Sequence, residues 1–128
     1  MHAVAAICLG ACAGALLRWQ LGLWLNHAAA WLPSGTLAAN LVGGYLVGLA
    51  VALLHHNPQI DATWRLLLVT GFLGALTTFS SFSAEVVEMA LAQRWAQAAV
   101  TALAHLSGSL LLTFAGIRTA LFFIAARA

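Results

Sequence analysis

Hydrophobic residues run along this chain in four long blocks, and a short polar or turn-forming segment separates each block from the next. The blocks cover about residues 3–25, 34–54, 62–91 and 96–124. A helix needs about 20 apolar residues to cross the hydrocarbon core of a bilayer, so each block predicts one transmembrane helix. We therefore expect an all-α membrane protein, with one four-span transmembrane domain that covers residues 1–128.

The third block has a weak helical centre. Gly71 and Gly74 precede the β-branched pair Thr77 and Thr78, and each glycine costs about 1 kcal/mol relative to alanine inside a helix. This pattern predicts a third helix that is broken in the middle, with its second half over residues 79–91. Broken helices at membrane depth expose carbonyl groups that can bind a cation.

Composition agrees with a membrane protein. Hydrophobic residues make up 63% of the chain and charged residues only 6%, whereas a soluble domain carries roughly 25% charged residues. All the basic residues are arginines, and they form no cluster. This pattern argues against nucleic-acid binding.

The arginines also bear on how the chain inserts. With four spans, Arg65 and Arg127 fall on one side of the membrane, and Arg18 and Arg94 fall on the other. Basic residues in short loops set the orientation of a membrane protein, and here their effects nearly cancel. Such a chain can insert both ways up, which would permit an antiparallel, dual-topology dimer. A bundle of four slender helices also leaves little room for an enclosed pore, so a partner subunit is expected.

Small and polar residues occur at regular spacings inside the spans. Gly10 with Gly14, and Gly44 with Gly48, form G-x-x-x-G pairs that allow helices to approach closely. The polar positions are Thr36 and Asn40 in the second span, Ser80, Ser81, Ser83 and Glu85 in the third, and His105, Ser109 and Thr113 along one stripe of the fourth.

Two interpretations remain open for these polar side chains. An Asn in a membrane helix either hydrogen-bonds a neighbouring helix or lines a polar pathway. Serine and threonine hydroxyls either bond back to carbonyls one turn earlier or face such a pathway, and Glu85 is either an interfacial residue or a pathway residue. No acidic residue is placed to orient His105 for catalysis, and no metal-ligand spacing occurs, so we do not expect an enzyme.

Four motifs together resemble the Fluc/CrcB family of fluoride channels, and the match spans essentially the whole chain. They are R-W at residues 18–19, G-T-L-x-x-N at 35–40, G-x-x-G-x-x-T-T-F-S-x-F-S at 71–83 and H-x-x-G-S at 105–109. Two departures are mild. Ser81 stands where many members have Thr, which keeps the hydroxyl, and Ala39 stands where Val is common.

The resemblance implies a channel in the bacterial inner membrane that passively exports fluoride and so protects the cell from its toxicity. It implies a dual-topology homodimer with two pores, each built from both subunits. It also implies a structural sodium ion at the dimer interface, held by the backbone carbonyls of Gly74 and Thr77 from each subunit.

The resemblance further implies roles for individual side chains. Phe79 and Phe82 would form an aromatic box, since the edge of a phenyl ring is electropositive and can contact a small anion. The implied fluoride pathway comprises Thr36, Asn40, Phe79, Ser80, Ser81, Phe82, Ser83, Ser109 and Thr113. Arg18, Glu85 and His105 would take vestibule or gating roles.

Two other classes of protein remain as alternatives. Small multidrug-type proton-coupled exporters have a similar size and four spans, but they carry a membrane-centred Glu in the first span, and residues 1–26 contain none. Proton-dependent cation transport that requires Glu85 would favour such an exporter. A non-transporting scaffold subunit would explain the glycine pairs, although it would leave the clustered hydrogen-bond donors unexplained.

Overall fold

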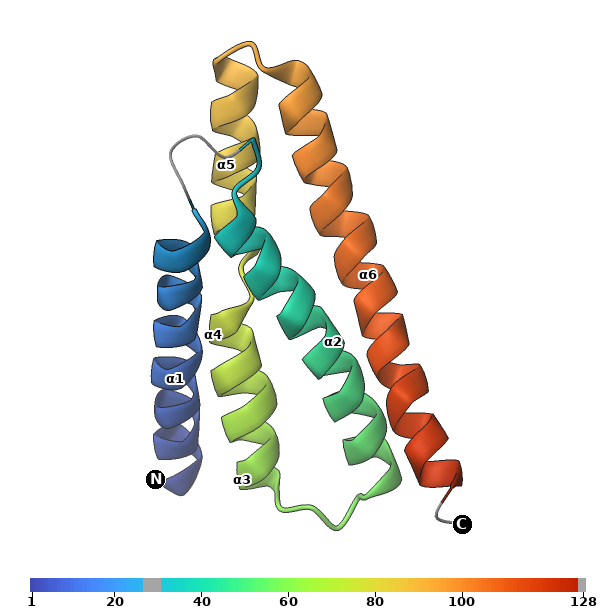
Figure 1. The fold of residues 1–128 in the computed structure, drawn as a ribbon. Coiled ribbons are helices and arrows are strands. Elements are labelled where there is room, and N and C mark those ends of the chain that lie inside the picture. Colours follow the sequence, from blue (N-terminus) through green and yellow to red (C-terminus); the bar gives the residue numbers. More distant parts are fainter. Residues whose placement is uncertain (27–30, 127–128) are drawn as a thin grey trace.

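The computed structural model describes residues 1–26 and 31–126, and it folds them into a bundle of long helices (Figure 1). The elements are α1 (His2–Leu25), α2 (Ser34–His56), α3 (Ala62–Arg65), η1 (Leu66–Leu73), α4 (Gly74–Leu76), α5 (Phe79–Leu91) and α6 (Trp95–Ala125). Four stretches are long and apolar enough to cross a membrane: His2–Leu25, Ser34–His56, Ala62–Leu91 and Trp95–Ala125. The prediction of an all-α, four-span chain is therefore confirmed.

Successive spans run in opposite directions along the bundle. The start of α1, the connection from α2 to α3 and the end of α6 lie at one end, and the turn from α5 to α6 lies at the other (Figure 1). Arg65 ends α3 at the first of these ends, and Arg94 immediately precedes α6 at the second. Arg127, which we expected on the same side as Arg65, lies outside the described residues.

The start of the third span lies in a polar loop and has a side-chain cap. The carboxylate of Asp61 accepts a 2.7 Å hydrogen bond from the backbone N–H of Thr63. Hydrogen bonds from the Thr63 hydroxyl and backbone lower the pKa of Asp61, because they stabilise its charged form. The carboxylate therefore satisfies a backbone donor that the first turn of the helix leaves unpaired.

The third span changes its backbone geometry four times. It begins as a short α-helix, widens into the π-helix η1, and tightens again in the single turn of α4. Thr77 and Thr78 then adopt extended conformations, with φ and ψ of −79° and 150° for Thr77 and −148° and 117° for Thr78. Helical geometry resumes at Phe79, where the Thr78 hydroxyl accepts a 3.1 Å hydrogen bond from the N–H of Ser81 and caps α5.

Glycines lie where pairs of helices approach each other closely. A Cβ atom added at Gly10 or Gly14 of α1 would collide with backbone atoms of η1, and one added at Gly48 of α2 would collide with the backbone of α6. At Gly44 the carbonyl oxygen of Ser109 lies 3.1 Å from the position of an added Cβ. These contacts confirm that both G-x-x-x-G pairs serve close helix approach.

Candidate functional site

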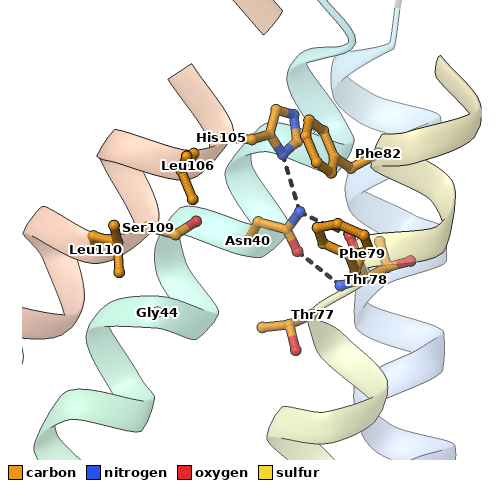
Figure 2. Close-up of a pocket in the computed structure, with 10 residues that line it drawn as sticks. All are labelled: Asn40, Gly44, Thr77, Thr78, Phe79, Phe82, His105, Leu106, Ser109 and Leu110. Atoms are coloured by element: carbon orange, nitrogen blue, oxygen red, sulfur yellow. Dashed lines mark hydrogen bonds between the residues drawn. The ribbon is translucent and has the colours of Figure 1, made fainter. Parts of the chain in front are cut away.

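A cavity of about 280 Å³ lies beside the extended residues of the third span, between α2, α5 and α6 (Figure 2). It brings together many of the predicted site residues from elements far apart in the sequence. The residues that line it are Asn40, Gly44, Thr77, Thr78, Phe79, Phe82, His105, Leu106, Ser109 and Leu110.

Asn40 joins three parts of the chain at this cavity. Its Oδ1 accepts a 2.7 Å hydrogen bond from the N–H of Thr78, and its Nδ2 donates at 3.0 Å to the carbonyl of the same residue. Nδ2 also lies 3.0 Å from Nδ1 of His105 on α6 (Figure 2). Asn40 therefore makes interhelical hydrogen bonds, which was one of the two interpretations, and it makes them from the wall of the cavity.

These bonds change which backbone carbonyls of the third span are paired. In a continuous helix the N–H of Thr78 would donate to the carbonyl of Gly74, and the N–H of Ser81 would donate to that of Thr77. Here the first N–H donates to Asn40 and the second to the Thr78 hydroxyl. The interruption therefore takes the helical donors away from Gly74 and Thr77, the two residues that the family resemblance singled out as cation ligands.

Three aromatic rings follow one another along the cavity wall. Phe79 and Phe82 pack edge to face, with ring centroids 5.4 Å apart and an interplanar angle of 67°. Phe82 in turn stacks on His105, with centroids 4.6 Å apart and an angle of 23°. Phe79 is 79% exposed, so one ring of the pair faces away from the single chain. Edge-to-face packing presents electropositive ring edges, which attract anions.

The polar residues along one stripe of α6 have two different surroundings. His105 and Ser109 line the cavity, whereas the hydroxyl of Thr113 donates a 3.0 Å hydrogen bond to the carbonyl of Gly44 on α2. Thr113 is therefore bonded across the α2–α6 interface, and it does not line the cavity. Its partner is thus a carbonyl of the neighbouring helix and not a carbonyl one turn earlier in α6.

A second cavity, of about 250 Å³, lies on the side of the interruption that faces α1. Arg18, Thr36 and Ser81 line it, together with Ala15, Trp19, Gly22 and Thr78. The hydroxyl of Thr36 donates to Oε1 of Glu85, which ties α2 to α5, and Oε2 of Glu85 is buried without a partner among the described residues. Because Thr78 lines both cavities, the extended segment forms part of the wall between them.

Three predicted pathway residues line neither cavity: Thr113, described above, and Ser80 and Ser83. Ser80 is exposed, and its hydroxyl lies 3.3 Å from that of Thr78. The hydroxyl of Ser83 donates a 2.8 Å bond to the carbonyl of Phe79 one turn earlier, which is the back-bonding that membrane helices permit.

Sequence reasoning missed several residues of the larger cavity. Thr78 is the central one, because its backbone binds Asn40 and its hydroxyl caps α5; its position in the T-T-F-S motif was the available signal. Leu106 and Leu110 each follow a polar residue of the α6 stripe by one position. Their apolar character carries no chemical signal in a membrane helix.

Acidic residues, histidines and cysteines do not gather into a metal site in the described part of the chain, since no three of them lie close enough to hold an ion. Any cation bound near the interruption would therefore depend on other ligands, such as backbone carbonyls.

Comparison with known proteins agrees with this arrangement. The sequence profile described as "CrcB-like protein, Camphor Resistance (CrcB)" matches residues 5–117. A relative from Albidiferax ferrireducens, named fluoride-specific ion channel FluC, is 64% identical over 125 residues, which cover 98% of this chain and 95% of the relative. Relatives of the same name from Paracidovorax citrulli and Variovorax paradoxus are 57% and 63% identical, cover 95% and 91% of this chain, and are themselves covered to 96% and 92%. The chain therefore belongs to the Fluc/CrcB family.

Proposed function

We propose that this protein is a fluoride-selective channel, a multi-pass protein of the bacterial inner membrane, which exports fluoride passively and so protects the cell. The observation that carries the proposal is the edge-to-face pair of Phe79 and Phe82 on the wall of a cavity that Asn40 and Ser109 also line. The name of these relatives, fluoride-specific ion channel, supports the same function. The family consists of ion channels, and we assign no catalytic role to any residue.

The chemistry of the larger cavity suits a small anion that must both enter and leave. Its lining residues offer ring edges and the hydroxyl of Ser109, and none of them is Arg or Lys. Uncharged donors replace part of an ion's hydration shell, whereas a buried cationic side chain would hold the anion too tightly for conduction. Passive flow is sufficient for export, because fluoride that enters an acid-exposed cell as neutral HF is trapped inside as the anion.

The two cavities suggest the order of the route. Arg18 lines the smaller cavity with Thr36 and Ser81, where a positive charge would concentrate anions at the entrance. Fluoride would pass from there to Phe79 and Phe82, and then along Ser109 toward Thr113. Ser80 and Ser83, which line neither cavity of the single chain, would contribute only where a second subunit adds to the wall. Glu85 would control access beside Thr36.

We further propose that the working unit is an antiparallel homodimer with two pores. Phe79 is 79% exposed, and Gly74 also lies on the surface of the single chain, at the middle of the third span. A second copy would cover both residues and complete the wall of each pore. In the sequence, the near balance of Arg18 and Arg94 against Arg65 and Arg127 would allow the two copies to insert with opposite orientations.

Sodium fits the residues near the interruption. The carbonyls of Gly74 and Thr77 have lost their helical donors, and hard cations prefer oxygen ligands of this kind. We propose that these carbonyls, from both copies, hold a structural Na⁺ at the dimer interface. When bound, the ion would supply a fixed positive charge near the route of the anion.

The experiment that tests the channel is fluoride efflux from liposomes that contain the purified protein, followed with a fluoride electrode. We expect rapid fluoride efflux with chloride retained, and loss of flux in Phe79→Ile and in Phe82→Ile. Phe114→Ile is the matched control, because Phe114 is 62% exposed on α6 and lines neither cavity.

Wild-type vesicles that retain fluoride as well as protein-free vesicles would overturn the proposal. Proton-dependent cation transport that requires Glu85 would then favour a small multidrug-type exporter. Vesicles that transport neither kind of ion would favour a scaffold subunit.

A further inference from the structure

The hydrogen bonds around Asn40 determine the protonation state of His105. The N–H of Thr78 can only donate, so the atom of Asn40 that faces it must be the oxygen; the amide nitrogen then faces the Thr78 carbonyl and Nδ1 of His105. An amide nitrogen is a donor and has no acceptor capacity. Nδ1 of His105 must therefore be an unprotonated acceptor, and the ring must be the neutral tautomer with its proton on Nε2.

The same ring also contacts the aromatic part of the site. His105 is only 3% exposed, and it stacks on Phe82 at a centroid distance of 4.6 Å. Figure 2 shows the ring of His105 beside that of Phe82, with Nδ1 directed at Asn40 and the second nitrogen on the far side of the ring. This second nitrogen is buried and has no partner among the described residues. A single side chain of α6 thus contacts one residue of α2 and one of α5.

We propose that His105 is a positioning residue of the pathway: in its neutral form it orients the amide of Asn40 and the ring of Phe82. The inference rests on the proposed channel function, and it deepens that function, because His105 need not contact the anion. Through Asn40 it also acts on the backbone of Thr78, and so on the interruption of the third span.

A proton on Nδ1 would disrupt this arrangement. It would place an N–H of His105 against an N–H of Asn40, two donors without an acceptor. If the amide of Asn40 turned over to receive the new proton, its nitrogen would then face the N–H of Thr78 instead. Neither orientation of the amide pairs the N–H of His105 together with both the N–H and the carbonyl of Thr78. An unsatisfied buried group costs about 1–3 kcal/mol. The arrangement in the structure therefore depends on a neutral His105.

The charged and titratable groups around His105 are few. Among the elements packed against it, α5 carries Glu85, one helical turn from Phe82, and Glu88, and α2 carries the uncharged residues Thr36 and Asn40. The charged residues of α6 itself, Arg94 at its N-cap and Arg118, lie toward its two ends. Glu85, the acid nearer to Phe82 along α5, is the group whose own titration must be separated from that of His105.

The test compares two substitutions of His105, one that keeps its hydrogen-bond acceptor and one that keeps its aromatic ring. His105→Asn keeps an acceptor close to the position of Nδ1 but removes the ring and its titration, whereas His105→Phe keeps a ring to stack on Phe82 but removes the acceptor. Fluoride efflux is measured for each between about pH 5 and 8, the range in which histidine titrates. Efflux from protein-free vesicles is subtracted at each pH to remove the leak of HF.

We expect wild-type flux to fall toward acid pH, by about tenfold per pH unit below its midpoint, because one proton removes the active form. His105→Asn should lose this acid dependence and should carry more fluoride than His105→Phe. In His105→Phe the amide proton of Thr78 should exchange faster with solvent. Glu85→Gln should keep the acid dependence, which would separate the two titrations.

A nitrogen-15 NMR spectrum of the wild-type protein tests the tautomer without any substitution, and a proton on Nδ1 at neutral pH would overturn the proposal. The proposal also fails if His105→Asn retains the acid dependence of the wild type, or if His105→Phe matches the wild type in both flux and Thr78 exchange. Wild-type flux at neutral pH distinguishes these failures from failure of the channel function itself.

Discussion

Replacing Asn40 with leucine removes the side chain that holds the interruption of the third span, and the cost can be worked out from its partners. Leucine fills a similar volume and makes no hydrogen bonds. The change leaves three groups without their partner: the N–H and the carbonyl of Thr78, and Nδ1 of His105. Thr78 and His105 are only 7% and 3% exposed, so water cannot readily take the place of the amide.

Two energy scales bracket the loss. Unsatisfied buried groups in soluble proteins cost about 1–3 kcal/mol each, which gives roughly 3–9 kcal/mol for three groups. Hydrogen bonds in membrane proteins average about 0.6 kcal/mol, with a maximum of about 1.7, because the unfolded chain in the membrane also finds partners. The N–H of Thr78 can in addition return to the carbonyl of Gly74. We therefore expect the lower scale to apply, with a loss of about 2 kcal/mol in the free energy of unfolding.

The assay is reversible unfolding in mixed micelles, followed by tryptophan fluorescence at a fixed protein concentration, since dimer formation would make stability depend on concentration. Thr113→Val is the matched control, because it removes one hydrogen bond between α2 and α6, and we expect it to cost about 0.6 kcal/mol. Hydrogen exchange at Thr78 provides a local measurement. An Asn40→Leu variant that loses no more stability than Thr113→Val, with the exchange of the Thr78 amide altered in neither, would refute this reasoning.

Three further predictions concern packing, charge and the cation. Gly10→Ala should destabilise the protein by about 1–3 kcal/mol, the usual cost of overpacking, because its Cβ would collide with η1; Gly22→Ala should cost little, because the nearest atom to its Cβ lies 3.9 Å away. Unfolding of the two variants in micelles decides this, and equal losses would contradict it. Arg18→Gln should lower fluoride flux several-fold at low ionic strength and less at high ionic strength, since salt screens the charge. Arg118→Gln should not lower the flux, because Arg118 lines neither cavity. Liposome efflux at two salt concentrations measures both variants. The thermal unfolding midpoint should rise with Na⁺ concentration but not with N-methylglucamine at equal ionic strength, because a bound ion stabilises only the folded state; a midpoint that responds equally to both cations would argue against a sodium site.

Much of the fold could be predicted from the sequence, because a transmembrane helix requires a long apolar run and the chain contains four. The close helix approach at Gly10 and Gly14 followed from their spacing for a similar local reason. The π-helical geometry of η1 could not be predicted, because no residue pattern in that segment distinguishes it from an α-helix. The segment lies in close contact with α1, where Gly10 and Gly14 approach its backbone.

The sequence predicted which residues belong to the site better than it predicted the hydrogen bonds that they make. Asn40, Phe79, Phe82, His105 and Ser109 were all singled out beforehand, and they line one cavity. Their partners could not be predicted, because a side chain that bonds to backbone carries no complementary residue type in the sequence. The bond from Asn40 to the Thr78 backbone is of this kind, and so is the bond from Thr113 to the Gly44 carbonyl.

Several polar side chains of the site hydrogen-bond the backbone where the third span is interrupted. A helix that stops inside a membrane is tolerated only where its unpaired N–H and C=O groups find other partners. Asn40 binds both backbone groups of Thr78, and the Thr78 hydroxyl binds the N–H of Ser81. These bonds stabilise the interruption, and they also take the helical donors away from Gly74 and Thr77. The bonds that make the break possible thus free the carbonyls that a cation would need, so a substitution at Asn40 should weaken the fold and the proposed cation site together.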